Sequence, residues 1–126
     1  MKNIKIVVVE FDTLPESDMY SMERGWGNGY IGVPKEHECF GLSYNDDTFN
    51  EFCSLHSIHA HGGFTYSEPW NPEIRKEDNE YWWFGFDTAH GGDTPEEWTE
   101  EKVNKHTSKL AFKFITIEHK LNMLDV

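Results

Sequence analysis

Histidine and aspartate side chains concentrate at two Gly-Gly pairs in this sequence of 126 residues. His61 stands directly before the first pair, and His90 stands directly before the second, between Asp87 and Asp93. Catalytic and binding groups are commonly carried by loops at the ends of strands. Imidazole and carboxylate groups together can transfer protons near neutral pH or bind a divalent metal ion. The sequence therefore predicts a polar site formed by His61, Asp87, His90 and Asp93.

Two kinds of chemistry fit these four residues. In the acid–base interpretation, His61 and His90 act as general acid and base, and Asp87 or Asp93 orients an imidazole. In the metal interpretation, the same four side chains bind an ion such as Zn²⁺ or Mn²⁺. A purely structural interpretation stands beside both: the glycines mark turns, the aspartates cap them, and the histidines are hydrogen-bonded bystanders.

The residues around the histidines suggest how a ligand would be held. Gly62, Gly63, Gly91 and Gly92 would let a phosphate group approach backbone N–H groups. His59 precedes His61 by two residues, so on a strand both rings would point to the same side as a His-x-His chelate.

Aromatic and basic residues supply further candidates for ligand binding. Arg24 and Trp26 lie in a glycine-rich segment that a strand follows, whereas the dinucleotide-binding motif opens a helix, so this is not a Rossmann loop. A tight turn explains the glycines, and Arg24 clamping a phosphate while Trp26 stacks on a base is the functional alternative. Trp83 is interpreted as a core residue, with an aromatic wall for a ligand as the alternative.

The charge of the chain excludes several functions. Its formal charge is −12, from 23 Asp plus Glu and 11 Lys plus Arg, which disfavours direct binding to a nucleic-acid backbone or an anionic membrane. The sequence contains no apolar run of membrane-spanning length and no pattern of a secretory signal. Cys39 and Cys53 form neither a redox pair nor a zinc motif, so buried, unreactive thiols are expected.

Hydrophobic patterns predict the elements that position these residues. Strands are expected over Lys2–Phe11, in the interior of a sheet, over Tyr30–Pro34, over Ile58–Tyr66 around the glycine pair, and centrally over Tyr81–Asp87. The segments 12–23 and 67–80 are expected to be loops.

Two helices are expected as well. One runs from Thr48 to about Leu55, with Asp46 or Asp47 as its cap and Phe49, Phe52 and Cys53 on one face. The other begins with Thr94 as N-cap and Pro95 as its first residue, and its apolar stripe continues to the C-terminal end. A restart near Thr107 and a strand over Phe112–Ile117 are the alternatives. The stripe consists of Val103, Thr107, Leu110, Phe114, Ile117, Leu121 and Leu124.

These elements predict a single domain over residues 1–126 with an α+β fold. In this fold a mainly antiparallel sheet is packed by the long C-terminal helix, and the two Gly-Gly turns meet at one end of the sheet. The high aromatic content makes a homo-oligomer an additional expectation.

Three segments resemble a family of small proteins found chiefly in bacteriophages and prophages. They are GYIGVPKEH at 29–37, HGGFTY at 61–66 and WFGFDTAHGGD at 83–93, whereas family members share GYVGVPKGHP, HGGLT and GFDxAHxGD in this order. The resemblance covers about residue 29 to the end and adds His37 to the candidate ligand-binding residues. It implies a phage protein that acts in the cytoplasm of the infected bacterial host.

The first functional hypothesis follows from the predicted site and the resemblance. The protein would bind, and hydrolyse, a small phosphorylated ligand such as a signalling nucleotide, as a phosphodiester or nucleotide hydrolase that acts against host defence. A ligand-sequestering protein would need only the pocket. The rival is an acidic inhibitor or DNA mimic that binds a host nucleic-acid-binding protein, such as a defence protein, through the acidic segments 12–23 and 68–80.

Overall fold

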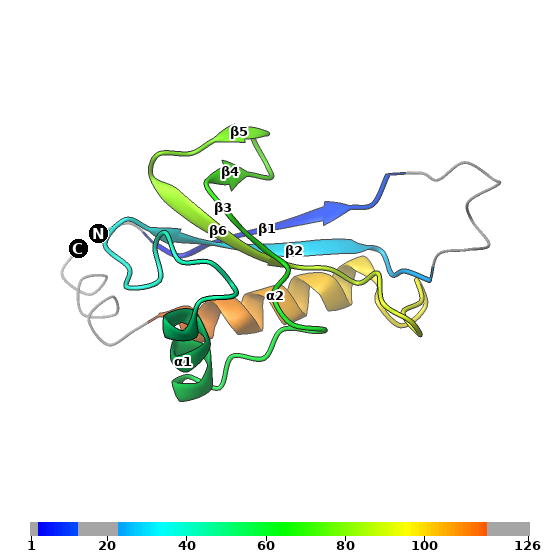
Figure 1. Ribbon diagram of the computed structural model, residues 1–126. Helices are drawn as coiled ribbons and strands as arrows, with labels where there is room; N and C mark the ends of the chain where they lie inside the picture. The colour runs from blue at the N-terminus through cyan, green and yellow to red at the C-terminus, as the bar shows by residue number, and fades with distance from the viewer. Residues whose placement is uncertain (1–2, 13–22, 116–126) are drawn as a thin grey trace.

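The computed structural model describes residues 3–12 and 23–115 of the chain. Four strands form an antiparallel sheet in the order β1-β2-β6-β3, as Figure 1 shows. Two further short strands pair as a small second sheet, and the described residues also contain two helices. The elements are β1 (Lys5–Glu10), β2 (Gly27–Pro34), α1 (Asp47–Leu55), β3 (Tyr66–Glu68), β4 (Trp70–Asn71), β5 (Lys76–Glu77), β6 (Tyr81–Phe86) and α2 (Glu100–Phe114).

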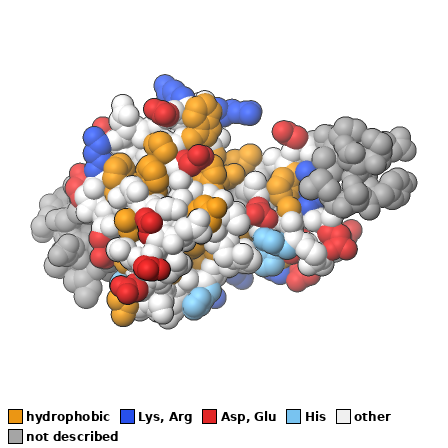
Figure 2. All heavy atoms as spheres, viewed as in Figure 1, with side chains coloured by type: hydrophobic (Ala, Val, Ile, Leu, Met, Phe, Trp, Pro, Cys, Tyr) orange, Lys and Arg blue, Asp and Glu red, His pale blue; other side chains and the backbone are white. Residues whose placement is uncertain are grey.

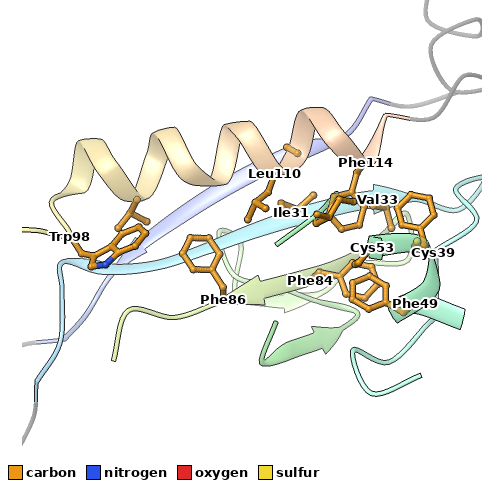
Figure 3. Packing of buried hydrophobic residues seen from close by; sticks show 14 residues of the cluster. Ile31, Val33, Cys39, Phe49, Cys53, Phe84, Phe86, Trp98, Leu110 and Phe114 are labelled. Atoms are coloured by element: carbon orange, nitrogen blue, oxygen red, sulfur yellow. The ribbon is translucent and has the colours of Figure 1, made fainter. Parts of the chain in front are cut away.

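The C-terminal helix α2 packs on the sheet, mainly over β1 and β2, which confirms the predicted α+β fold. Figure 3 shows the core that this packing buries. On α2, Leu110 and Phe114 face side chains of β2 and β6, and Phe49 of α1 stacks on Phe84 of β6 with ring centroids 4.3 Å apart. Both helices thus cover the same face of the sheet.

The strand β6 lies between β2 and β3, as its aromatic sequence predicts. Its Phe84 and Phe86 belong to the core under the helices. Trp83 points to the opposite face, where its ring lies directly over Gly32 of β2. A strand that is covered on both faces needs apolar side chains at successive positions, and this need explains the aromatic run.

The predicted helix over Thr48–Leu55 is confirmed as α1, one residue longer at its start. Phe49, Phe52 and Cys53 are its buried residues, as expected. Asp46 is the N-cap, but its carboxylate accepts from the N–H of Ser43 and not from an N–H of the helix.

The position predicted for the N-terminal strand is wrong. The strand predicted over Lys2–Phe11 is β1, which among the described residues pairs only with β2 and forms an edge of the sheet. Its apolar run has a different cause, since Val8 packs against the core beneath α2 while Ile6 stays 40% exposed. An apolar β-branched run therefore does not distinguish an interior strand from an edge strand that a helix covers.

The second strand begins earlier than predicted. It starts at Gly27, within the glycine-rich segment that the sequence indicates as a turn. A Cβ at Gly27 would collide with the backbone of Val9 in β1, and one at Gly29 would collide with Thr107 of α2. These glycines permit close packing of strands and helix, so they belong to the strand.

The segment predicted as a strand over Ile58–Tyr66 is a connection with tight turns, and only Tyr66 belongs to a strand. Ser57, Gly62 and Gly63 have φ values of 55°, 70° and 84°, which extended strands do not adopt. The segment predicted as a loop over 67–80 contains the end of β3 and the short strands β4 and β5.

The helix α2 begins one turn later than predicted. Thr94 caps only a single turn, where its Oγ1 accepts from Glu97 N and its carbonyl accepts from Trp98 N. Thr99 is the true N-cap, and its Oγ1 accepts from Lys102 N. Phe112 is helical, against the alternative of a strand there, while Ile117, Leu121 and Leu124 lie outside the described residues.

Both cysteines are free and buried, as expected. Burial raises the pKa of the Cys39 thiol, and it raises the pKa of the Cys53 thiol to about 11. Thiols with raised pKa values form little of the reactive thiolate near neutral pH. In the described part of the chain, neither helix has the length and hydropathy that a bilayer crossing requires.

Candidate histidine and aspartate site

The two glycine turns meet beyond the end of β6, and one carboxylate joins them. His61 Nε2 lies 2.8 Å from Asp93 Oδ1, and His90 Nδ1 lies 3.1 Å from Asp93 Oδ2. A carboxylate only accepts, so both ring nitrogens carry the proton in these bonds. Asp93 therefore holds two imidazoles whose rings lie 5.2 Å apart and nearly perpendicular.

His90 lies between two carboxylates. Its Nε2 is 3.4 Å from Asp87 Oδ1, on the opposite side of the ring from Asp93. The Asp87 carboxylate is itself held by Thr65 Oγ1 and by the N–H of Ala89. Because Nδ1 donates to Asp93, the Nε2 lone pair of a neutral His90 faces the Asp87 carboxylate.

Asp93 is nearly buried, with 6% of its side chain exposed, while the His61 and His90 side chains are 28% and 34% exposed. Burial alone raises the pKa of Asp93. Hydrogen bonds from His90 N and from both imidazoles outweigh that effect and hold its pKa below the ordinary value. Asp93 thus remains a carboxylate, and the two rings are accessible to a ligand. Figure 2 shows histidine side chains on the surface next to acidic ones.

Two residues outside the glycine turns support His61, and neither is among the residues predicted from the sequence. They are Trp98, just before α2, and His106, within α2. His106 Nε2 accepts from the N–H of His61 at 3.1 Å, so His106 is neutral with its proton on Nδ1. Burial lowers the pKa of His106, and the neighbouring His61 and lysines lower it further. The ring of Trp98 packs on the His61 ring at 4.3 Å. One feature of the sequence could have drawn attention to His106, namely its position next to Thr107 of the apolar stripe.

Hydrogen bonds also hold the second turn in place. Thr88 is fully buried, and its Oγ1 donates to Gly27 O at the start of β2. The N–H of Gly25 donates to Thr88 O, and the N–H of Trp26 donates to Trp98 O. These bonds fasten the segment between β6 and α2, which carries Asp87, His90 and Asp93, to β2.

The glycine amides offer only part of the predicted phosphate cradle. Among the described residues, the N–H groups of Gly62 and Gly91 have no protein acceptor. The N–H of Gly63 donates to Ala60 O, and the N–H of Gly92 donates to the carboxylate of Glu23. A carboxylate thus already occupies one position predicted for a phosphate oxygen.

A cavity of about 830 Å³ adjoins the site through Asp93, and Arg24 and Trp26 line it as well. Arg24 is engaged, because its guanidinium donates to Asp12 O and lies over the Phe11 ring. The other ionisable residues of the lining are acidic: Glu10, Asp12, Glu23, Asp93, Glu96 and Glu100. The cavity therefore favours cations over free anions.

Three other candidates lie apart from the cluster. His37 is buried near the end of α2, with Nε2 2.6 Å from Phe114 O and Nδ1 accepting from Cys39 N. Trp83 is fully buried and does not reach a surface. His59 is exposed and lies outside any strand, so the predicted His-x-His chelate does not form.

The described residues contain one group that offers mixed ligands for a metal ion. It consists of His61, His90 and Asp93, whose ligand atoms lie within 4.8 Å of one another. The cluster can thus act as two imidazoles oriented by a carboxylate, or as a His₂Asp ligand set. Comparison of the chain with protein-family models, curated proteins and solved structures gave no significant match.

Proposed function

We propose that the cluster of His61, His90, Asp87 and Asp93 binds and hydrolyses a small phosphorylated ligand. The observation that carries the proposal is the sharing of Asp93 by two accessible imidazoles. An imidazole whose one nitrogen donates to a carboxylate is fixed in orientation, and its other nitrogen is left for proton transfer. In His61 this nitrogen is Nδ1, and in His90 it is Nε2, which faces Asp87. Two such rings side by side supply a base and an acid.

In the proposed reaction one imidazole removes a proton from water as its oxygen attacks phosphorus. The bond between phosphorus and the leaving oxygen breaks, and the second imidazole, in its protonated form, gives that oxygen a proton. The N–H groups of Gly62 and Gly91, which have no protein acceptor among the described residues, would donate to the phosphoryl oxygens. Burial of Asp93 keeps its carboxylate away from bulk water, which strengthens its hold on both rings.

The ligand class rests on the site together with the resemblance to phage proteins. Signalling nucleotides are small phosphorylated molecules of host defence, and their removal would benefit a phage. Trp26 in the adjoining cavity provides apolar surface against which a base can stack. A protein that sequesters the ligand without hydrolysis would use the same residues.

The test uses the full chain with a panel of linear and cyclic nucleotides, with and without chelator. Turnover is followed by ion-exchange chromatography and binding by calorimetry. The wild type is compared with the double variant His61→Ala, His90→Ala and with His59→Ala, an exposed control two residues from His61. Turnover that the double variant loses and the control retains supports hydrolysis. Binding without turnover supports sequestration, and neither one in the wild type overturns the proposal.

The acidic cavity favours a second candidate, an inhibitor that binds a basic surface of a host protein. Six carboxylates and a single, engaged arginine line it. Such binding would weaken steeply as salt rises, because the opposed surfaces attract at long range. Binding of a small ligand within the histidine site would depend on salt far less. Affinities measured at low and high ionic strength distinguish the two candidates.

A further inference from the structure

We infer that His61, His90 and Asp93 bind a divalent transition-metal ion of the zinc class. Imidazole nitrogens and a carboxylate oxygen are the ligands that such ions take in catalytic sites, where three protein ligands leave one position for water. His61 comes from the first glycine turn, and His90 and Asp93 come from the second. The inference deepens the proposed function, on which it rests: a bound ion would activate the attacking water in place of an imidazole base. Its test needs no substrate.

The distances fit this assignment. A nitrogen and an oxygen bound to one tetrahedral zinc ion stand about 3.4 Å apart, given bond lengths of about 2.1 Å. The nitrogens of His61 and His90 lie 2.8 and 3.1 Å from the oxygens of Asp93. Separations larger by about 0.6 Å at His61 and about 0.3 Å at His90 would admit the ion. For a neutral His61 the ion takes the place of the Nε2 proton, which moves to Nδ1 of the same ring.

The residues around the three ligands hold them in place. The N–H of His90 donates to Asp93 Oδ2, and the N–H of His61 donates to His106 Nε2. The Trp98 ring packs on His61, and the Gly62 backbone lies against the His90 ring so closely that a Cβ would collide with it. Partners of this kind fix the orientation of metal ligands and raise affinity.

The surrounding charge favours a cation and explains why one is needed. Asp87 lies 3.4 Å from His90, and Glu23 binds Gly92 at the same turn. The adjoining cavity is lined by further carboxylates. A free phosphate would be repelled here, whereas a bound divalent ion neutralises the carboxylates and attracts phosphoryl oxygens. The metal inference thus reconciles a phosphorylated ligand with an acidic site.

Cobalt(II) titration of the full metal-free chain tests the inference, because four-coordinate Co²⁺ absorbs visible light strongly and occupies zinc sites. The expected result is one Co²⁺ per chain in a low-symmetry four-coordinate spectrum that Zn²⁺ abolishes. His61→Ala and His90→Ala are expected to weaken binding by at least about 10-fold, while His59→Ala is expected to leave it unchanged. Asp93→Asn serves as the third ligand variant, and far-UV circular dichroism checks that each variant folds.

Absence of the spectrum in the wild type, or equal binding by folded His61→Ala and His90→Ala, overturns the inference. Nucleotide turnover that chelator does not diminish, in a protein that binds no Co²⁺, also overturns it and leaves the proposed hydrolysis standing. Co²⁺ binding that both histidine variants lose, without binding or turnover of any nucleotide, supports the metal site and overturns the proposed function.

Discussion

His61 Nε2 and Asp93 Oδ1 lie 2.8 Å apart although 32 residues separate them in the chain. This contact joins the turn after α1 to the turn after β6, and the Asp93 carboxylate extends the link to His90. The site therefore depends on the relative position of two glycine turns. Substitutions in these turns should change the site even where they alter no functional side chain.

Gly62→Ala is expected to damage the site and Gly63→Ala to spare it. Both glycines have positive φ, so both substitutions strain the backbone and lower the free energy of unfolding by about 1 kcal/mol or more. Only at Gly62 does the new Cβ meet the His90 ring, while at Gly63 it enters open space. Co²⁺ affinity measured on both folded variants should fall for Gly62→Ala alone. Equal losses would show that backbone strain, not displacement of His90, governs the site.

Glu23→Gln is expected to strengthen binding of an anion. Its carboxylate accepts from Gly92 N–H, where a phosphate oxygen is predicted to bind, and it repels an incoming anion. Removing one unit charge about 4 Å away at an exposed site is worth about 1 kcal/mol, or about fivefold in affinity. Calorimetry with inorganic phosphate measures the change. Glu96 is a carboxylate of the same cavity, and Glu96→Gln should increase phosphate affinity less than Glu23→Gln does. A larger effect of Glu96→Gln would place the anion elsewhere.

The free energy of unfolding should decrease as the pH is lowered, in part because His106 becomes protonated. Because the pKa of His106 is lowered from 6.5 in the folded state, the unfolded state binds its proton more readily. The contribution to stability is complete above about pH 6.5 and is lost as pH falls toward the folded pKa. His106→Gln retains an oxygen that accepts from His61 N–H but does not titrate. Urea unfolding at about pH 7.5 and about pH 5.5 should show a smaller decrease for the variant. A decrease equal to that of the wild type would contradict the prediction.

His37→Ala is expected to destabilise the fold and leave the site intact. His37 links Cys39 N and Phe114 O in a buried position, and its removal leaves both backbone groups without this partner. The expected loss in the free energy of unfolding is about 1–3 kcal/mol, measured with urea. Co²⁺ affinity of the folded variant should equal that of the wild type. A loss of Co²⁺ affinity without a loss in the free energy of unfolding would contradict the prediction and indicate that His37 is a ligand-binding residue.

Patterns within one element predicted the corresponding parts of the fold well. The aromatic run of β6 indicated a strand covered on both faces, and the three apolar residues of α1 indicated its buried side. The predicted convergence of His61, Asp87, His90 and Asp93 also agrees with their positions, because both glycine turns lie beyond the end of β6.

Features that depend on contacts between distant segments were harder to predict. Within residues 3–12 and 23–115, β1 pairs only with β2 and is therefore an edge strand, and its own residues do not indicate how many partner strands it has. Trp98 and His106 contact His61 because the first half of α2 packs on the sheet. Their spacing from His61 in the sequence does not indicate these contacts. The His59 prediction failed because it assumed a strand where the backbone turns.

Ring-nitrogen NMR of the seven histidines tests the central claim, one site formed by two imidazoles on Asp93, most directly. Long-range ¹H–¹⁵N correlation spectra above about pH 8 identify which nitrogen of each neutral ring carries the proton. The structure predicts protonated Nε2 in His61 and protonated Nδ1 in His90. Zn²⁺ should then shift the signals of both rings together while those of the exposed His59 stay unchanged. An Nδ1-protonated His61, or signals of His61 and His90 that respond no more than those of His59, would contradict the account.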